Sequence, residues 1–589
     1  MIRKDIRKLN YGTRTEIRVV EGYRDRNNKV KQKTIKTFGY LEDQDDPITF
    51  MEMVKDYNDN YKKSKRITYS KNTDIPFHLD PSGVLYNYGY RFLEVIYEKL
   101  ELDLFFTSIN FNNKYSLNDI FKFLVFQRIL NPDSKRATYQ NIQTFYREYG
   151  DYSLDDVYRS LDKFNEVKIE LQKYINDKIK TIIGRDSSYA YYDVTNYYCE
   201  IDLPNDEDDL RQRGVSKEHR VDPIIQLGLF MDSNGLPISM SLFKGNTSDT
   251  KTLQPVMKEI KANYHLNRLI VVADKGLNSS SNINYICNNG DGYVVSQILK
   301  GKKGKKYKEE LFNESTYIAN AMNTFRYKTF IEEYEGLDQD GNKVIRKRKV
   351  LIYWKYEDAI VEARKRDDKL ARAIKSLGNN AYSIKHTYEQ YIKELHSVNL
   401  TGEIADKVDR VIDEDKISED AKYDGYFCII TSELEYDYKK ILEVYGGLWR
   451  IEETFRITKN ELDVRPIFLS TENHINGHFI ICFVALVLLR MLQYKIDYSM
   501  SAERIVRALN KCMCRIPEKG YIELPRGEIL REYKKVKTKE GKEVYSHSLT
   551  NNDETIQDLL IIIEKYNTYP YFSNSAQNDF NQYLEKIQY

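Results

Sequence analysis

The 589-residue chain is longer than one hydrophobic core usually supports, so we expect two or more domains. Apolar residues make up 41% and charged residues 31%, a balance that excludes a wholly disordered chain. The longest apolar run, Phe479–Leu489, has 11 residues, fewer than the ~20 of a membrane-spanning helix. Six cysteines without a CxxC pair argue against a disulfide scaffold and a structural zinc site. We therefore expect a cytoplasmic protein that does not cross a membrane.

The net charge of +2 excludes a uniformly basic protein that coats nucleic acid, but the basic residues are unevenly placed. Met1–Tyr40 holds 12 Lys and Arg against 4 Asp and Glu, and Arg504–Glu543 holds 12 against 6. Lys300–Lys308 holds six lysines and no acid. Such runs indicate faces that meet a polyanion, although each one alone is equally consistent with a solvated loop.

The N-terminal third of the chain predicts a basic β-hairpin followed by helices. Residues 14–39 alternate polar and apolar side chains on either side of a polar turn, which is the pattern of a hairpin. Residues 41–80 are polar and predict a linker with a short helix. Over residues 81–183 the apolar period becomes helical, with capping signals at Ser116 and Ser153.

The rest of the chain predicts an α/β domain with an insertion. Strands alternate with helices, and the expected strands are Tyr189–Val194, Ile224–Met231, Leu236–Lys244, Leu269–Ala273, Tyr293–Ser296 and Asp424–Thr431. Residues 300–420 break this alternation with a lysine run, strands at Tyr317–Glu333 and Lys349–Tyr353, and polar helices from Glu357 to about Leu395. We interpret this block as an insertion in one discontinuous domain.

Two aspartates end apolar strands of the predicted α/β domain. Asp193 lies near the end of the first strand, and Asp274 directly follows the strand 269–273. Carboxylates at strand ends lie at the sheet edge where ligands bind, and two that lie close together repel each other unless a cation neutralises them. Oxygen ligands of this kind suit Mg²⁺ or Mn²⁺. For either aspartate alone, a helix cap or a turn is the alternative interpretation.

A third carboxylate lies on a predicted helix that begins near Tyr445. At about 100° per residue, Glu452, Arg456 and Lys459 fall within about 40° of the line through Tyr445. Glu453 falls off this stripe, so Glu452 is the acid that accompanies the two basic residues. The alternative is an exposed helix with an ordinary Glu–Arg pair four residues apart.

Together these residues resemble a bacterial insertion-sequence transposase of the DDE type, in the subclass with a Tyr–Arg–Glu–Lys signature (insertion-sequence family four and its relatives). Asp193, Asp274 and Glu452 match its three acids in order, with spacings of 81 and 178 residues. The long second spacing resembles that of this subclass, in which a mostly β domain interrupts an RNase H-like fold. Tyr445 and Lys459 match the first and last positions of the signature.

One position departs from the signature. Its arginine corresponds to Leu448 in this chain, so Arg450 or Arg456 would take over that phosphate contact. The resemblance implies that Tyr445 and Lys459 also contact DNA phosphates.

The resemblance implies two-metal chemistry on DNA. Two Mg²⁺ or Mn²⁺ ions would be held by Asp193, Asp274 and Glu452, and the same site would cleave the element's ends and join their 3′-OH groups to target DNA. The implied partners are the terminal inverted repeats, target DNA and a second copy of the chain in a synaptic dimer, with no nucleotide cofactor and no membrane. The alternatives are a metal-dependent nuclease that cuts without joining and a DNA-binding relic without activity.

The expected fold class is therefore multidomain, with an N-terminal β-hairpin, a helical DNA-binding domain and an α/β RNase H-like catalytic domain interrupted by a β-containing insertion. The expected boundaries are 1–80 for the basic hairpin and linker, 81–185 for the helical domain, 186–299 and 421–500 for the two parts of the catalytic domain, 300–420 for the insertion and 501–589 for a C-terminal basic region.

Overall fold

The computed structural model divides the chain into two compact units, Met1–Leu85 and Tyr86–Tyr589. The residues that the structure describes are 2–9, 12–24, 30–43, 50, 51, 53–55, 57, 58, 85–109, 111, 114–145, 151–185, 189–201, 206–218, 220–264, 268–377, 389–398, 404–515, 521–523, 532–537, 543–548, 558, 562 and 571–573.

In its described residues, the first unit is an antiparallel sheet of three strands with a short helix. The strands are β1 (Ile2–Leu9), β2 (Gly12–Arg24) and β3 (Val30–Tyr40). Strands β2 and β3 pair as the predicted hairpin, whose turn lies outside the described residues. The prediction was incomplete, because β1 adds a third strand along β2. Ile17 and Val19 of β2 pack with Phe50 and Val54 of the helix, which gives the unit an apolar core.

The second unit begins, in the part of the chain that is described, with six helices, which confirms the helical period of residues 81–183. They are α2 (Tyr90–Lys99), α3 (Leu102–Ser108), α4 (Leu117–Leu130), α5 (Lys135–Gln140), α6 (Leu154–Glu166) and α7 (Lys168–Ile183). Both predicted caps are present. Ser116 Oγ accepts the Asp119 N–H at 3.1 Å, and Ser153 and Asp156 form a capping box.

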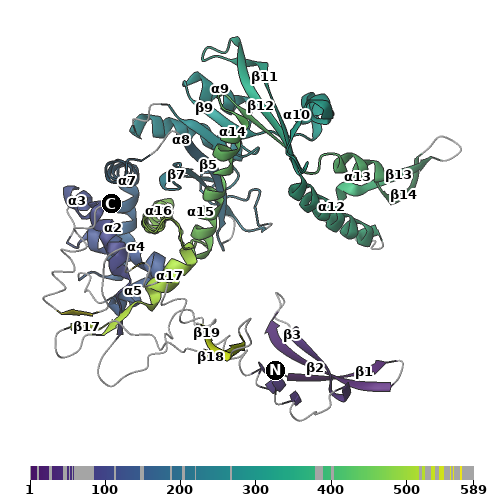
Figure 1. Ribbon diagram of the computed structural model, residues 1–589. Coiled ribbons are helices and arrows are strands. Elements are labelled where there is room, and N and C mark those ends of the chain that lie inside the picture. Colours follow the sequence, from purple (N-terminus) through teal and green to yellow (C-terminus); the bar gives the residue numbers. More distant parts are fainter. Residues whose placement is uncertain are drawn as a thin grey trace. The chain divides into compact units, whose positions relative to one another are not determined.

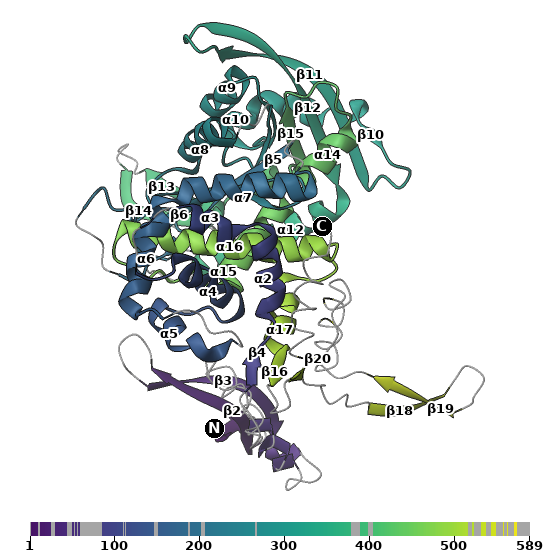
Figure 2. The ribbon, with the colours of Figure 1, turned by 90° about the vertical axis from the view of Figure 1, so that its left-hand side faces the viewer.

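Helix α16 (Glu472–Lys495) runs through the core of the second unit (Figure 2). Its mean hydropathy of 2.1 and its length would allow it to cross a membrane, but its apolar window is wholly buried in protein. The helix packs against α2, α4 and α6, and also against α15 (Trp449–Asn460) and strand β7 (Pro237–Lys244). Because neighbours surround it, every residue from Ile475 to Gln493 is apolar or buried, as expected of a core helix.

A buried lysine lies where α5 meets α16. Lys135 Nζ is 3.1 Å from His478 Nδ1, and both residues are buried. The pKa of Lys135 is lowered to about 7, chiefly by burial and also by the charge of Arg128, with an opposing effect of Cys482. Burial likewise lowers the pKa of His478, so this imidazole stays neutral.

Replacing Lys135 with methionine is expected to remove a pH dependence of stability. The unfolded chain keeps this lysine protonated up to about pH 10, whereas the folded chain releases the proton near pH 7. The unfolded state therefore binds more protons across this window, and the free energy of unfolding rises with pH by up to about 1.4 kcal/mol per unit. Denaturant unfolding at pH 7, 8 and 9 should show this rise in the wild type and in Lys163→Met, an exposed control, but not in Lys135→Met. Equal slopes in all three would contradict the assignment.

The second unit also contains a mixed sheet of nine described strands, in the order β10-β11-β12-β15-β9-β8-β5-β6-β7. The strands are β5 (Tyr189–Tyr198), β6 (Ile224–Met231), β7, β8 (Ile270–Ala273), β9 (Gly292–Ser296), β10 (Ile318–Ala319), β11 (Phe325–Leu337), β12 (Lys343–Lys355) and β15 (Tyr426–Thr431). β5, β8 and β9 run parallel, and the other neighbouring pairs are antiparallel. The predicted strands of the α/β domain are confirmed.

Helices cover both faces of the sheet around β5. Because alternate residues of a strand point to opposite faces, the core to which each β5 residue belongs shows which helices lie on its side. Tyr191 and Tyr197 belong to the large core that includes α15 and α16. Tyr192 belongs to a second core under α8 (Asp249–Tyr264) and α9 (Ser280–Asn288). Odd-numbered residues of β5 therefore face α15 and α16.

The block predicted as an insertion extends this sheet (Figure 1). β11 and β12, each of 13 residues, pair with each other, and β12 pairs with β15, the neighbour of β9. Further elements in the block are α10 (Gly301–Gly304), α11 (Lys308–Phe312), α12 (Tyr356–Leu377), β13 (Ile392–Val398), β14 (Ile404–Ile412) and α13 (Glu414–Ala421). The predicted continuation of helix to Leu395 is wrong, because β13 pairs there with β14.

After α16 the chain continues into helix α17 (Ala502–Lys511), whose cap Ser501 accepts the Arg504 N–H at 3.3 Å. The Arg504 guanidinium forms an ion pair with Asp558. Much of the predicted basic region 501–589 lies outside the described residues. The remaining strands are β4 (Leu85–Asn87), β16 (Met513–Arg515), β17 (Tyr521–Glu523), β18 (Glu532–Lys537), β19 (Glu543–Ser548) and β20 (Tyr571–Ser573).

Candidate active site

The register of the parallel pair β5 and β8 brings Asp193 and Asp274 together. Tyr191 of β5 is the register partner of Val272 of β8, so Asp193 and Asp274, each two residues further on, occupy equivalent positions on neighbouring strands. By the same alternation both aspartates lie on the sheet face that carries Tyr191 and Val272, which is the face toward α15. Asp193 lies within β5, and Asp274 directly follows β8, at its carboxyl end.

Burial and neighbouring charges perturb Asp193. Its carboxylate accepts the N–H of Val194 at 2.7 Å. The pKa of Asp193 is raised to about 6, chiefly by burial; the Lys217 ammonium and the Val194 N–H oppose this rise, and the charges of Asp249 and Asp274 contribute to it. Repulsion between neighbouring carboxylates is the physical signature of a place that a cation would stabilise.

Asp274 is exposed and is held by two hydroxyl donors. Ser296 Oγ, at the end of β9, donates to Asp274 Oδ1 at 2.8 Å, and the Tyr445 hydroxyl approaches the same oxygen at 3.3 Å. Burial raises the pKa of Tyr445, so this hydroxyl keeps its proton and can donate. Tyr445, predicted to contact a DNA phosphate, thus lies within hydrogen-bond distance of Asp274.

Tyr445 is not part of the helix that carries Glu452, which corrects the expected single helix. α14 (Tyr438–Gly446) ends one residue after Tyr445, and α15 begins at Trp449. A Cβ on Gly447 would lie 2.0 Å from the hydroxyl oxygen of Tyr191, so only glycine fits this close approach to β5. The break between the helices thus coincides with the point at which the chain is pressed against the sheet.

Helix α15 packs along β5, the strand that carries Asp193. The Tyr191 hydroxyl donates to the Val444 carbonyl at 3.2 Å just before the helix, and the Tyr197 hydroxyl lies 2.6 Å from Thr458 Oγ1 near its end. Asp193 lies between these two tyrosines on the strand, and Glu452 lies between the two contact points on the helix. Glu452 is exposed, and no hydrogen bond or ion pair to either aspartate is present among the described residues.

Glu453, the neighbouring acid, has a structural partner instead. Its Oε2 accepts Arg490 Nη1 at 2.9 Å. Arg490, on α16, is 1% exposed and also donates to Thr454 Oγ1 and to the Arg450 carbonyl, at 2.6 and 2.8 Å. This buried guanidinium fixes α15, whereas Glu452 makes no ion pair with any of the residues that the structure describes.

The predicted phosphate-binding residues of α15, Arg450, Arg456 and Lys459, differ in their exposure and in the residues they contact. The Arg450 side chain packs against Gly235, in the turn between β6 and β7, with its Cδ 3.1 Å from a Cβ built there. Arg456 is exposed and lies 3.8 Å from Glu453. Lys459 is mostly buried, interacts electrostatically with Asp193 and forms an ion pair with Glu218 at 3.3 Å. Of the three, Lys459 is the residue that the structure brings to the acids.

The acidic residues provide only oxygen donors, which fits a Mg²⁺ or Mn²⁺ ion. Asp193 and Asp274 occupy equivalent positions on neighbouring strands, and Glu452 belongs to α15, the helix that packs on the same side of the sheet. As they stand, no three His, Cys, Asp or Glu side chains of the described residues are grouped closely enough to coordinate one ion. The two aspartates therefore form the part of the site that is already assembled.

Sequence reasoning missed three charged residues near the acids. Lys217 and Glu218 lie in the irregular segment between β5 and β6, and Arg465 follows α15. Lys217 Nζ donates to the Val194 carbonyl, beside Asp193, and Arg465 forms an ion pair with Glu218. No periodicity marks such residues, and the polar, charged character of the segment was the one available signal.

A cavity of about 390 Å³ lies beside Asp274. Its lining residues are Lys275, Asn278, Ser279, Ser280, Ile283, Asn284, Gln297, Ile298, Lys306, Tyr334, Glu335 and Arg348. Two of its cations are already paired, because Glu332 Oε1 accepts Arg348 Nε at 2.6 Å and Lys306 Nζ at 3.2 Å.

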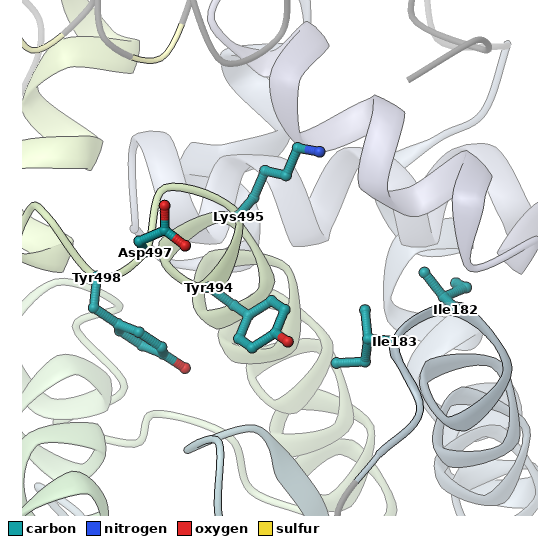
Figure 3. Close-up of a pocket in the computed structure, with 6 residues that line it drawn as sticks. All are labelled: Ile182, Ile183, Tyr494, Lys495, Asp497 and Tyr498. Atoms are coloured by element: carbon teal, nitrogen blue, oxygen red, sulfur yellow. The ribbon is translucent and has the colours of Figure 1, made fainter. Parts of the chain in front are cut away.

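A further cavity, of about 600 Å³, lies between the end of α7 and the last turn of α16 with the residues that follow it. It is lined by Ile182, Ile183, Tyr494, Lys495, Asp497 and Tyr498. Figure 3 shows the ring of Tyr494 directed toward Ile183. None of the predicted site residues lines this cavity, so we assign it no part in the chemistry.

Comparison with known families identifies the two parts of the chain. Residues 211–488 match the family model of the transposase DDE domain, and residues 2–66 match that of the N-terminal domain of IS1634 family transposases. The first match includes Asp274 and Glu452, and Asp193 lies before its start. A comparison with curated proteins gives no match. The predicted transposase is thereby confirmed, whereas the Tyr–Arg–Glu–Lys subclass stays a prediction. The chain therefore contains a transposase DDE domain, and it begins with a region similar to the N-terminal domain of IS1634 family transposases.

Proposed function

We propose that this transposase binds the terminal inverted repeats of an insertion sequence, cleaves the phosphodiesters at the element's ends and joins the 3′-OH ends to target DNA. The observation that carries the proposal is the placement of Asp193 and Asp274 at equivalent positions of two neighbouring parallel strands. The helix that bears Glu452 packs along the first of these strands, on the same face. This arrangement provides two of the carboxylates that two-metal phosphodiester chemistry requires and carries the third on the adjacent helix.

The sheet topology supports an RNase H-like catalytic domain. Three antiparallel strands, β7, β6 and β5, are followed in the sheet by the parallel strands β8 and β9. This order resembles the RNase H-like fold expected from the sequence. In open sheets of this kind, ligands bind outside the carboxyl ends of parallel strands, which is where Asp274 lies.

DDE transposases generally use divalent metals, and in this chain Asp193, Asp274 and Glu452 would hold them. A bound Mg²⁺ or Mn²⁺ pair supplies charge neutralisation at the scissile phosphate and activation of the attacking hydroxyl. The chain's own residues orient these ligands. The Val194 N–H fixes the carboxylate of Asp193, and Ser296 and Tyr445 fix that of Asp274.

Other residues bind the DNA around the acids in this proposal. Lys217 and Lys459 both interact electrostatically with Asp193 and are the cations that would meet a phosphate there. The first unit and the helical part of the second unit would recognise the terminal repeats, with phosphate contacts that make binding salt-dependent. Two copies of the chain would hold the two ends of one element in a synaptic complex.

A strand-transfer assay tests the proposal. The purified protein is incubated with duplexes that carry the terminal repeats of its own element, together with a supercoiled plasmid and Mg²⁺. Joined product that depends on Mg²⁺ and is lost with EDTA supports the proposal. Mg²⁺-dependent cleavage with no joined product would instead indicate a nuclease, and binding without cleavage would indicate an inactive relic.

A further inference from the structure

One carboxylate beside the candidate active site is held by two cations from different parts of the chain. Glu218 Oε1 lies 3.3 Å from Lys459 Nζ and forms an ion pair with Arg465 Nη1. Glu218 belongs to the segment between β5 and β6, Lys459 to the last turn of α15, and Arg465 to the segment after it. The contact therefore joins two segments that are more than 200 residues apart in the sequence.

The two cations are more enclosed than ordinary surface charges. The side chains of Lys459 and Arg465 are 15% and 23% exposed, and that of Glu218 is 27% exposed. The ring of Tyr197, on β5, lies 5.8 Å from Lys459 Nζ. Charges in such a setting are screened less by solvent than exposed ones, so the pair attracts an anion more strongly than two surface cations would.

The same cations lie next to the catalytic acids. Lys459 interacts electrostatically with Asp193 and with Lys217, whose ammonium donates to the backbone carbonyl of Val194. A DNA strand bound at Asp193 would bring further phosphates into this neighbourhood, because successive phosphates follow one another along the strand at short intervals.

Glu218 has the charge and shape of a substitute for one phosphate. A carboxylate and a phosphodiester each carry one negative charge on two terminal oxygens, and both bind Lys and Arg through charge-assisted hydrogen bonds. One carboxylate facing two cations leaves the group with a net positive charge. Such a pair can exchange its internal carboxylate for an external phosphate without leaving either cation unpaired.

We propose that Lys459 and Arg465 form a subsite for one DNA phosphodiester and that the Glu218 carboxylate fills this subsite in the DNA-free protein. The inference rests on the proposed function, since it places a DNA strand along α15. A DNA phosphate can then bind the two cations only after Glu218 has left them. This step costs free energy and lowers the affinity for any DNA whose other contacts with the protein are too few to offset the cost. Arg465 is thereby a phosphate-binding residue, and Glu218 acts through Lys459 and Arg465 as a positioning residue.

The test compares two variants that remove the same charge. Glu218→Gln keeps the shape of the side chain but removes its charge, and Glu419→Gln does the same at an acid that also pairs with two cations, Lys308 and Lys422, at 2.8 and 3.2 Å. Affinity for a fluorescent duplex is measured by anisotropy in EDTA, so that no chemistry takes place. Glu218→Gln is expected to bind at least about fivefold more tightly than the wild type, and Glu419→Gln to stay within about twofold of it. Equal affinities of the two variants would overturn the proposal.

A second experiment, in the Arg465→Gln variant, distinguishes release of the two cations by Glu218 from a general effect of its negative charge on DNA binding. Arg465→Gln alone is expected to weaken binding, and in that background Glu218→Gln should give little or no gain, because half of the subsite is missing. If the gain persists undiminished, Glu218 acts by long-range repulsion and the proposal fails.

If Glu218→Gln lowers the melting temperature, Glu218→Asp supplies the test, because its shorter carboxylate should release the cations and also tighten binding. These measurements do not depend on strand transfer, so a negative joining assay would leave this result standing.

Discussion

Asp193→Asn and Asp274→Asn are each expected to lower cleavage and joining of DNA ends by at least about 10³-fold, because each removes a charged ligand from the metal site. The affinity for the terminal repeats in EDTA should change by less than about twofold, since neither carboxylate is required to bind DNA phosphates. Removing one of the two carboxylates also relieves their mutual repulsion, so the folded state should be at least as stable as the wild type. The measurements are product formation on gels, anisotropy and thermal unfolding.

Glu452→Gln is expected to behave in the same way, and Glu453→Gln is not. Glu453 is engaged by Arg490, so its amide variant should lose stability more than chemistry. Asp437→Asn is the matched control for the aspartates, because Asp437 caps α14 and asparagine caps equally well. Activity above one tenth of wild type in either Asp193→Asn or Asp274→Asn would remove that residue from the catalytic set.

Arg490→Met is expected to be the most destabilising of these substitutions. It removes a guanidinium that is 1% exposed and that binds Thr454, Glu453 and the Arg450 carbonyl. Breaking such a buried network leaves polar groups without partners, at a cost of about 3–5 kcal/mol in the free energy of unfolding. Because these contacts hold α15 against α16, strand transfer should also fall at temperatures where the variant is still folded.

Two variants show how much of the lost stability comes from the unpaired Glu453 charge and how much from lost packing. They are Arg490→Met and the double variant Arg490→Met/Glu453→Met. The double variant should regain part of the stability, since it no longer leaves the Glu453 carboxylate without its partner. Urea unfolding followed by circular dichroism and tryptophan fluorescence gives both values. A single variant as stable as the wild type would show that α15 is held by its apolar contacts alone.

Local signals in the sequence predicted most elements but not how distant strands pair. Helices α4 and α6 begin where Ser116 and Ser153 predicted them, because a cap depends on residues three positions apart. The membership of β11 and β12 in the central sheet could not be predicted, since β12 pairs with β15 across about 80 residues of chain. The strand Ile392–Val398 was missed because its charged residues favour a helix and its pairing with β14 decides the outcome.

The candidate site was also predictable only as far as local sequence signals reach. Asp193 and Asp274 could be recognised because strand ends are visible in the apolar pattern, and the parallel register then brings them together. The helical arithmetic from Tyr445 set Glu452 apart from Glu453, but Arg456 pairs with Glu453 in the structure. The arithmetic also assumed one continuous helix, whereas Gly447 lies against Tyr191 and the helix is broken there. The contact of Glu218 with α15 depends on tertiary structure alone, so no local pattern could reveal it.

Helix α16 has a mechanical consequence for the enzyme. The same helix is buried against α2, α4 and α6 of the region expected to read the terminal repeats and against α15, which carries Glu452. If α2, α4 and α6 shift when cognate DNA binds, we expect α16 to shift with them, because close-packed side chains transmit strain. We therefore expect recognition of the terminal repeats and the position of Glu452 to be coupled through α16, and we expect substitutions along this helix to alter the discrimination between cognate and unrelated ends.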